Sequence, residues 1–191
     1  MDLGMMYEQA RASERRPEYR GYTKVVFFKR KICVLFVCTE NICRSPLAEG
    51  LLKHHLKAAG LSGKVTVSSA GTVAGRPGAK PDPRAVKVAA LSGVNLGRIR
   101  VSKISAAKLA ASDFVIALDR SHYERLLKIS APEHHKKIQM LLDYLPQNAF
   151  PDGVPDPYYD SVESFKKVFN LIDDALEGLT AQLAVISTKP R

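Results

Sequence analysis

Residues 38–46 constrain this chain more than any other part of the sequence. They read Cys-Thr-Glu-Asn-Ile-Cys-Arg-Ser-Pro and directly follow a continuous apolar run at residues 32–37. Such a run is typical of a central parallel strand that is buried on both faces. Pro46 suits the first turn of a helix. The segment is therefore predicted to be a turn between a buried strand and a helix.

Cys38 and Arg44 enclose five residues of this predicted turn. Five residues suffice to wrap the backbone around a tetrahedral oxyanion, with successive N–H groups directed at its oxygens. Arg44 then adds a planar, two-pronged donor suited to phosphate. The N-terminus of the following helix favours both the bound anion and a thiolate at Cys38, which would be a nucleophile. The alternative, a core cysteine beside a solvated arginine, is disfavoured by the flanking strand and helix.

Apolar periodicity predicts an alternation of further strands and helices. Strands are expected at 65–69, 114–118 and 138–142, and helices at 47–59, 84–92, 106–112, 121–129 and 162–179. This order indicates an α/β fold, a four-stranded parallel sheet flanked by helices in a flavodoxin-like, doubly wound arrangement. Cys38 would follow the carboxyl end of the first strand, where such folds bind ligands. The segment after the fourth strand could bring Asp156 over the same edge.

Together, these residues make the chain resemble the low-molecular-weight protein tyrosine phosphatases, as a bacterial-type member, over about residues 31–186. Cys38 matches the nucleophile of that family and Arg44 its phosphate-binding arginine. A second motif, Asp-Pro-Tyr-Tyr at residues 156–159, lies more than a hundred positions downstream. There Asp156 matches the general acid of the family. Two short motifs in the right order make the resemblance specific.

The resemblance implies hydrolysis of phosphotyrosine through a cysteinyl-phosphate intermediate, without a metal or an organic cofactor. Asp156 would protonate the leaving phenolate and then act as a base towards water. The other residues expected to form the substrate site are Thr39, Glu40, Asn41, Ile42, Cys43, Ser45, Tyr158 and Tyr159. Asn41 and Ser45 would brace the loop, while the two tyrosines could stack on the substrate ring.

The chain departs from the family pattern at three places. Glu40 stands where the family usually has glycine, so its side chain would alter substrate choice if it points outward and weaken phosphate binding if it points inward. The histidine that many members use to brace the loop is not evident around residues 96–100. The segment 72–75 lacks the aromatic residue that often forms the second wall of the pocket.

Three alternative functions are less well supported by the sequence. A thiol-dependent arsenate reductase would need further cysteines, and none follows Cys43. An arginine phosphatase of the same family would carry threonine at the position of Ile42. A catalytically weakened regulator that binds phosphotyrosine or another anion has only Glu40 in its favour. The complete set of Cys38, Arg44 and Asp156 favours the tyrosine phosphatase.

Composition bears on the domain organisation, the location and the partners of the protein. The 191 residues are 46% hydrophobic, which is enough for one core. We expect a flexible basic extension (1–30), a phosphatase domain (31–186) and a C-terminal tail (187–191). The three cysteines lie within eleven positions, and no apolar stretch is long enough for a membrane span, so a cytoplasmic protein is expected. The net charge is +10, but no basic run with interleaved aromatics indicates nucleic acid. The expected partner is a phosphotyrosine-bearing protein, with a bacterial tyrosine kinase as one candidate.

Overall fold

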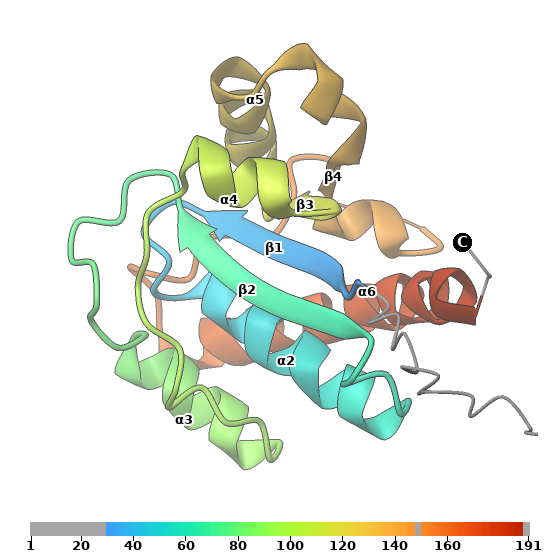
Figure 1. Ribbon diagram of the computed structural model, residues 1–191. Coiled ribbons are helices and arrows are strands. Elements are labelled where there is room, and N and C mark those ends of the chain that lie inside the picture. The colour runs from blue at the N-terminus through green and yellow to red at the C-terminus, as the bar shows by residue number, and fades with distance from the viewer. Residues whose placement is uncertain (1–29, 148–149, 189–191) are drawn as a thin grey trace, which may run out of the picture.

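The computed structural model describes residues 30–147 and 150–188. Nearly all of the predicted N-terminal extension therefore lies outside the described residues. The centre of the molecule is a parallel sheet in the order β2–β1–β3–β4 (Figure 1). Its strands are β1 (Ile32–Cys38), β2 (Val65–Gly71), β3 (Phe114–Ala117) and β4 (Ile138–Met140). The predicted four-stranded parallel α/β fold is confirmed.

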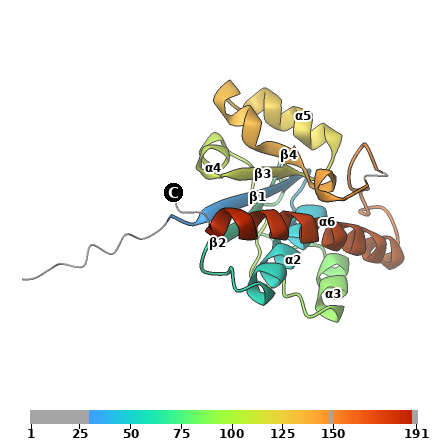
Figure 2. The ribbon, with the colours of Figure 1, turned by 90° about the vertical axis from the view of Figure 1, so that its right-hand side faces the viewer.

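Helices cover both faces of the sheet (Figures 1 and 2). One face packs against α2 (Arg44–Ala58), α3 (Pro83–Leu91) and α6 (Val162–Thr188), and the other packs against α4 (Ala106–Ala111) and α5 (Arg120–Ile129). Short 3-10 helices flank β4: η1 (Pro132–Lys137) and η2 (Leu141–Tyr144).

The strand β1 contributes to both cores. Val34 and Phe36 belong to the core under α2 and α6, whereas Leu35 and Val37 belong to the core under α4 and α5. Successive side chains of a strand point to opposite faces, so a strand covered on both sides needs apolar residues at every position. Burial of β1 on both faces therefore explains the uninterrupted apolar run, as the sequence predicted.

The predicted elements differ from the observed ones chiefly at their ends. β4 stops at Met140, two residues earlier than expected, because the backbone turns into η2 while Leu141 and Leu142 remain fully buried. Hydropathy registers that burial but not the change of backbone conformation. The last helix, α6, runs to Thr188.

The carboxyl ends of β1, β2 and β3 place three connections at one edge of the sheet. A side chain at Gly71, the last residue of β2, would lie 2.6 Å from the carbonyl oxygen of Thr39. Glycine at this position therefore lets the segment after β1 pass against the end of β2. The segment after η2 reaches the same edge, where the amide of Val154 donates to the carbonyl of Leu118 (2.8 Å).

Candidate active site

The segment from Cys38 to Ser45, here called the phosphate loop, joins β1 directly to α2. No described side chain forms a hydrogen-bonded cap at the start of α2. The backbone N–H groups of its first turn are therefore available to an anion, and the helix dipole favours negative charge there. Asn41 has a φ of 58°, a left-handed conformation that asparagine tolerates better than most residues. That residue bends the loop into a cradle.

A buried hydrogen-bond network fixes the shape of the phosphate loop. The Asn41 amide donates to the hydroxyls of Ser45 (2.9 Å) and Ser69 (2.8 Å), and its carbonyl oxygen accepts from the backbone N–H of Ser102 (2.9 Å). Asn41 is fully buried, and its bonds to Ser45 and Ser69 form away from water. The Ser45 hydroxyl lies 3.0 Å from the sulfur of Cys38 and can donate to its thiolate.

Ser69, Glu49 and Ser102 extend this hydrogen-bond network. The Ser69 hydroxyl donates to the carboxylate of Glu49 (2.6 Å), which lies one turn into α2 and pairs with Lys53. The backbone of Ser102 makes the bond to Asn41 described above, and its hydroxyl donates to the carbonyl of Ser69 (3.0 Å). Serine hydroxyls and a backbone amide thus brace the loop at the place where no histidine is evident around residues 96–100.

Arg44 is held between two carboxylates from distant parts of the chain. Its Nη1 lies 2.7 Å from Oδ2 of Asp119 and donates to the carbonyl of Val154 (3.0 Å), while its Nη2 lies 2.6 Å from Oδ2 of Asp156. The Arg44 side chain is only 4% exposed, whereas that of Asp156 is 48% exposed. Asp119 is thus the inner partner of the guanidinium, and Asp156 is the outer one that solvent can reach.

The surroundings of Asp119 stabilise its carboxylate form. It caps α5, accepting from the backbone N–H of His122 (2.9 Å) and from the hydroxyl of Ser121 (2.7 Å), and it lies 2.9 Å from Nδ1 of His122. Burial alone would raise its pKa, but the interactions with His122 and Ser121 outweigh burial and hold the pKa well below its usual range. Asp119 is therefore suited to orienting Arg44, not to donating a proton.

His122 links this carboxylate to the phosphate loop. His122 is 2% exposed, and its Nε2 lies 2.9 Å from the hydroxyl of Thr39, the residue after Cys38. A continuous chain of contacts consequently runs from Thr39 through His122 and Asp119 to Arg44. It holds the two ends of the phosphate loop relative to the end of β3.

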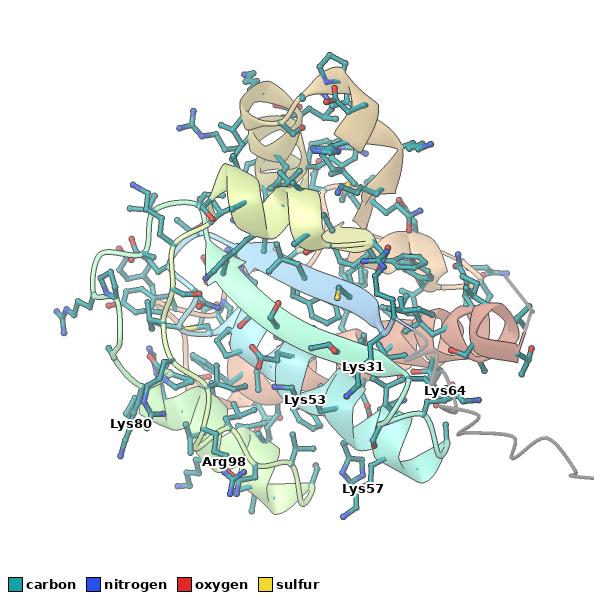
Figure 3. All side chains as sticks on the ribbon, viewed as in Figure 1. Lys31, Lys53, Lys57, Lys64, Lys80 and Arg98 are labelled. Atoms are coloured by element: carbon teal, nitrogen blue, oxygen red, sulfur yellow. The ribbon has the colours of Figure 1, made fainter. Side chains whose placement is uncertain are left out.

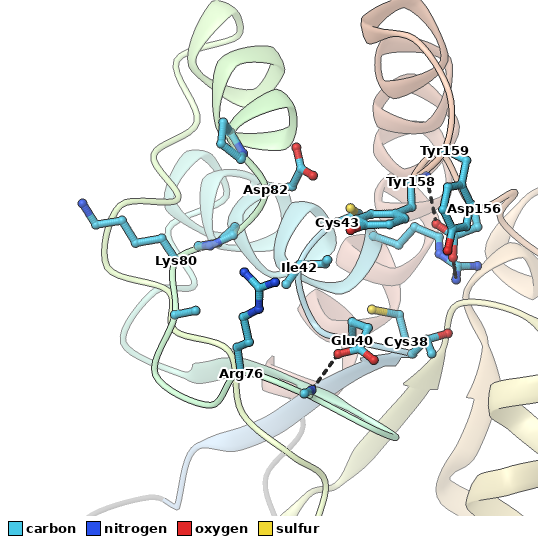
Figure 4. Close-up of a pocket in the computed structure, with 16 residues that line it drawn as sticks. Cys38, Glu40, Ile42, Cys43, Arg76, Lys80, Asp82, Asp156, Tyr158 and Tyr159 are labelled. Atoms are coloured by element: carbon cyan, nitrogen blue, oxygen red, sulfur yellow. Dashed lines mark hydrogen bonds and ion pairs between the residues drawn. The ribbon is translucent and has the colours of Figure 1, made fainter.

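A pocket of about 660 Å³ opens over the phosphate loop (Figure 4). The residues predicted for the site that line it are Cys38, Thr39, Glu40, Ile42, Cys43, Arg44, Asp156, Tyr158 and Tyr159. The two tyrosines and Asp156 stand on one side, and Arg76 stands on the other. Tyr158 is 41% exposed and Tyr159 95% exposed, so Tyr158 is the better placed to pack against a ring.

Two of the residues expected to bind substrate, Asn41 and Ser45, do not line the pocket. They lie behind the phosphate loop, within the network that fixes it. The pocket also contains residues that sequence reasoning did not assign to the site, among them Arg76 and Lys80. Nothing in the local sequence of these two marks them, because their role depends on how the loop after β2 folds back.

Metal and membrane features are absent from the part of the chain that the structure describes. Within residues 30–147 and 150–188, no group of three or more His, Cys, Asp or Glu side chains is arranged to hold a metal ion. None of the helices in these ranges is both long and apolar enough to cross a bilayer.

Comparisons with known proteins agree on one family. The model of the low molecular weight phosphotyrosine protein phosphatases matches residues 33–187. The low molecular weight protein-tyrosine phosphatase A of Mycobacterium tuberculosis is 40% identical over 147 residues, 76% of this chain and 88% of the relative. The crystal structure of YfkJ from Bacillus subtilis has a TM-score of 0.78 at 31% identity, covering 83% and 98% of the two chains. A structure of the YwlE arginine phosphatase has a TM-score of 0.71 at 28% identity, covering 80% and 96%.

Proposed function

Because the chain belongs to the low molecular weight phosphotyrosine protein phosphatase family, we propose that it hydrolyses phosphotyrosine in proteins through a cysteinyl-phosphate on Cys38. One observation carries the assignment of the catalytic residues. Arg44 and Asp156, separated by 112 positions, meet at 2.6 Å beside the pocket that Cys38 lines. A thiol, a guanidinium and a solvent-accessible carboxyl group at one site support the roles of nucleophile, phosphate-binding cation and acid.

In the first step, the Cys38 thiolate attacks phosphorus, so that the S–P bond forms as the bond to the tyrosine oxygen breaks. The Ser45 hydroxyl, 3.0 Å from the sulfur, stabilises the thiolate before the attack. Arg44 and the N–H groups at the start of α2 stabilise the charge on the non-bridging phosphoryl oxygens. Asp156 donates its proton to the departing phenolate, which is otherwise a poor leaving group.

In the second step, water attacks the cysteinyl-phosphate. Asp156, now a carboxylate, accepts a proton from that water as the S–P bond breaks. Inorganic phosphate leaves, and the Cys38 thiolate is restored. The same carboxyl group therefore serves both steps, which suits a residue that lies at the mouth of the pocket and is 48% exposed.

The pocket walls support an aromatic substrate. Ile42 and Tyr158 both line the pocket above the phosphate loop, and an apolar residue with an aromatic ring can enclose a phenyl group. The arginine phosphatase remains the alternative, because a structure of that activity shares the fold. Rates on phosphotyrosine, phosphoserine and phosphoarginine at equal concentration separate the two assignments. A preference for phosphoarginine would replace the tyrosine assignment.

The decisive test of the catalytic roles varies the leaving group. Asp156→Asn is expected to slow phosphotyrosine hydrolysis about 10²- to 10⁴-fold. It should affect much less an aryl phosphate whose phenolate leaves without a proton. Arg44→Ala should impair both substrates and weaken binding of inorganic phosphate, and Cys38→Ser should abolish turnover of both. Equal losses on both substrates in Asp156→Asn would remove it as the acid.

The cellular setting belongs to the same proposal. The division into an extension at 1–30, a phosphatase domain at 31–186 and a tail at 187–191 stays a prediction, as does a cytoplasmic location. A bacterial tyrosine kinase stays a candidate substrate. Incubating the enzyme with such an autophosphorylated kinase, and with Cys38→Ser as the control, tests that candidate by loss of phosphotyrosine signal.

A further inference from the structure

The loop between β2 and α3, residues 72–82, is attached to the phosphate loop along its length. Four N–H groups of this β2–α3 loop donate to four different residues of the phosphate loop. The pairs are Thr72 to the carbonyl of Cys38 (2.9 Å), Val73 to the carbonyl of Thr39 (3.0 Å), Gly75 to the carboxylate of Glu40 (2.6 Å) and Asp82 to the carbonyl of Ile42 (2.8 Å). The wall formed by the β2–α3 loop is thereby fixed relative to the phosphate loop.

Glu40 has a defined part in this attachment. Its side chain is directed to the β2–α3 loop, where it accepts from the Gly75 amide (Figure 4). The neighbouring Ala74 has a φ of 52° and is 4% exposed, so the loop bends sharply here around a packed residue. The next side chain after Gly75 is Arg76, which lines the pocket opposite the tyrosines.

Two cationic side chains, those of Arg76 and Lys80, line the pocket. Each acidic side chain that lines it already has a described partner: Glu40 the Gly75 amide, Asp82 the guanidinium of Arg84 (2.8 Å) and Asp156 the guanidinium of Arg44 (2.6 Å). Arg76 and Lys80 are both exposed, and neither is in an ion pair with any described residue. Arg76 and Lys80 therefore bring positive charge to this wall, which the carboxylate of Glu40, bonded to a neutral amide, offsets only in part.

We propose that Arg76, reinforced by Lys80 at the rim, forms a subsite for an acidic side chain close in sequence to the phosphotyrosine of the substrate protein. The inference rests on the proposed function and adds a preference to it. In a complex with the phosphate at Arg44 and the ring beside Tyr158, the opposite wall, which carries Arg76, would be open to the flanking peptide. The planar guanidinium of arginine suits bidentate pairing with a carboxylate.

The size of the effect follows from exposure. An ion pair in contact with water contributes modestly, so acidic flanks should raise kcat/KM by roughly threefold to tenfold. The charge of Glu40 lies on the same wall and reduces the gain. Because salt screens such pairs, the preference should shrink as ionic strength rises.

The test compares two phosphotyrosine peptides that differ only in having glutamate or glutamine at the flanking positions. The wild-type enzyme should prefer the glutamate peptide at low salt, and Arg76→Glu/Lys80→Glu should remove or reverse that preference. Arg76→Ala should reduce it partially. Lys57→Glu/Lys64→Glu changes the net charge equally at exposed positions outside the pocket (Figure 3), and it should keep the wild-type preference.

The outcomes separate the two proposals. If the wild-type enzyme hydrolyses both peptides equally well, or if the Arg76 and Lys80 variants keep the preference, the subsite is wrong while the phosphatase assignment stands. If the control variant loses the preference as fully as the pocket variant, net charge accounts for it and the subsite is wrong. If neither peptide is hydrolysed, the proposed function fails and the subsite fails with it.

Discussion

Cys43 lies five positions after Cys38, the proposed nucleophile, and lines the same pocket. Burial raises the pKa of this thiol far above its usual value, and the negative charge of Asp82 adds to the effect. Cys43 therefore remains a neutral thiol at neutral pH, in contrast to the thiolate that the proposed mechanism requires of Cys38. The two sulfurs of one short loop are suited to different tasks.

This difference predicts a protective disulfide that forms slowly. Peroxide oxidises the Cys38 thiolate to a sulfenic acid, and the Cys43 thiol can condense with it, forming the S–S bond and releasing water. Because the Cys43 pKa is raised, disulfide formation should quicken as pH rises. Peptide mapping after oxidation should find Cys38 joined to Cys43, and dithiothreitol should restore less activity in Cys43→Ser than in wild type. Equal recovery would count against the disulfide.

At the scale of elements, the helix N-termini around the sheet are used differently. Asp82 caps α3 and Asp119 caps α5, whereas the start of α2 has no capping side chain and faces the pocket. A bound oxyanion would take the place of a cap at α2. Inorganic phosphate or vanadate is therefore expected to raise the melting temperature in proportion to the logarithm of its concentration above Kd. Arg44→Ala should weaken this response, and a full response in that variant would contradict the role of Arg44.

Asp119 contributes to both helix α5 and the orientation of Arg44, and this predicts a pH-dependent stability. A carboxyl whose pKa is lower in the folded state stabilises the fold above its unfolded pKa of about 4. That contribution is lost as pH falls through the lower folded pKa. Asp119→Asn should therefore reduce the free energy of unfolding most near neutral pH, with a difference from wild type that narrows in acid. Urea unfolding across that range measures it, and a difference that does not change with pH would contradict the expectation.

The sequence predicted the parts of this molecule that depend on local pattern. The buried strand before Cys38 follows from its apolar run, and the pairing of Cys38 with Arg44 follows from their spacing. The contact of Arg44 with Val154 and Asp119 did not follow, because it depends on the approach of segments up to 110 positions apart. Arg76 was missed for the same reason, since only the bonds to the phosphate loop reveal where that side chain lies.

At the scale of the whole molecule, every residue of the proposed mechanism lies between positions 38 and 156. A chain that begins at residue 30 should consequently keep the kcat/KM of the full chain on free phosphotyrosine and keep its melting temperature. The removed segment carries net positive charge, so activity on highly acidic protein substrates is where a difference would appear. Parallel kinetics and thermal unfolding of the two chains check this. A large loss on free phosphotyrosine would show that the extension belongs to the catalytic unit.

The pairing of Arg44 with Asp156 has a consequence for how the enzyme tolerates its own product. In the proposed mechanism, phosphate would bind the guanidinium of Arg44, whose Nη2 already donates to the Asp156 carboxylate in the free protein. Inorganic phosphate would have to displace the Asp156 carboxylate from Arg44, so product inhibition is expected to be weaker than with an unpaired guanidinium. A substrate whose ring packs against Tyr158 would gain additional contacts that favour displacement of Asp156 from Arg44. The pairing is therefore expected to disfavour free phosphate relative to an aryl phosphate substrate.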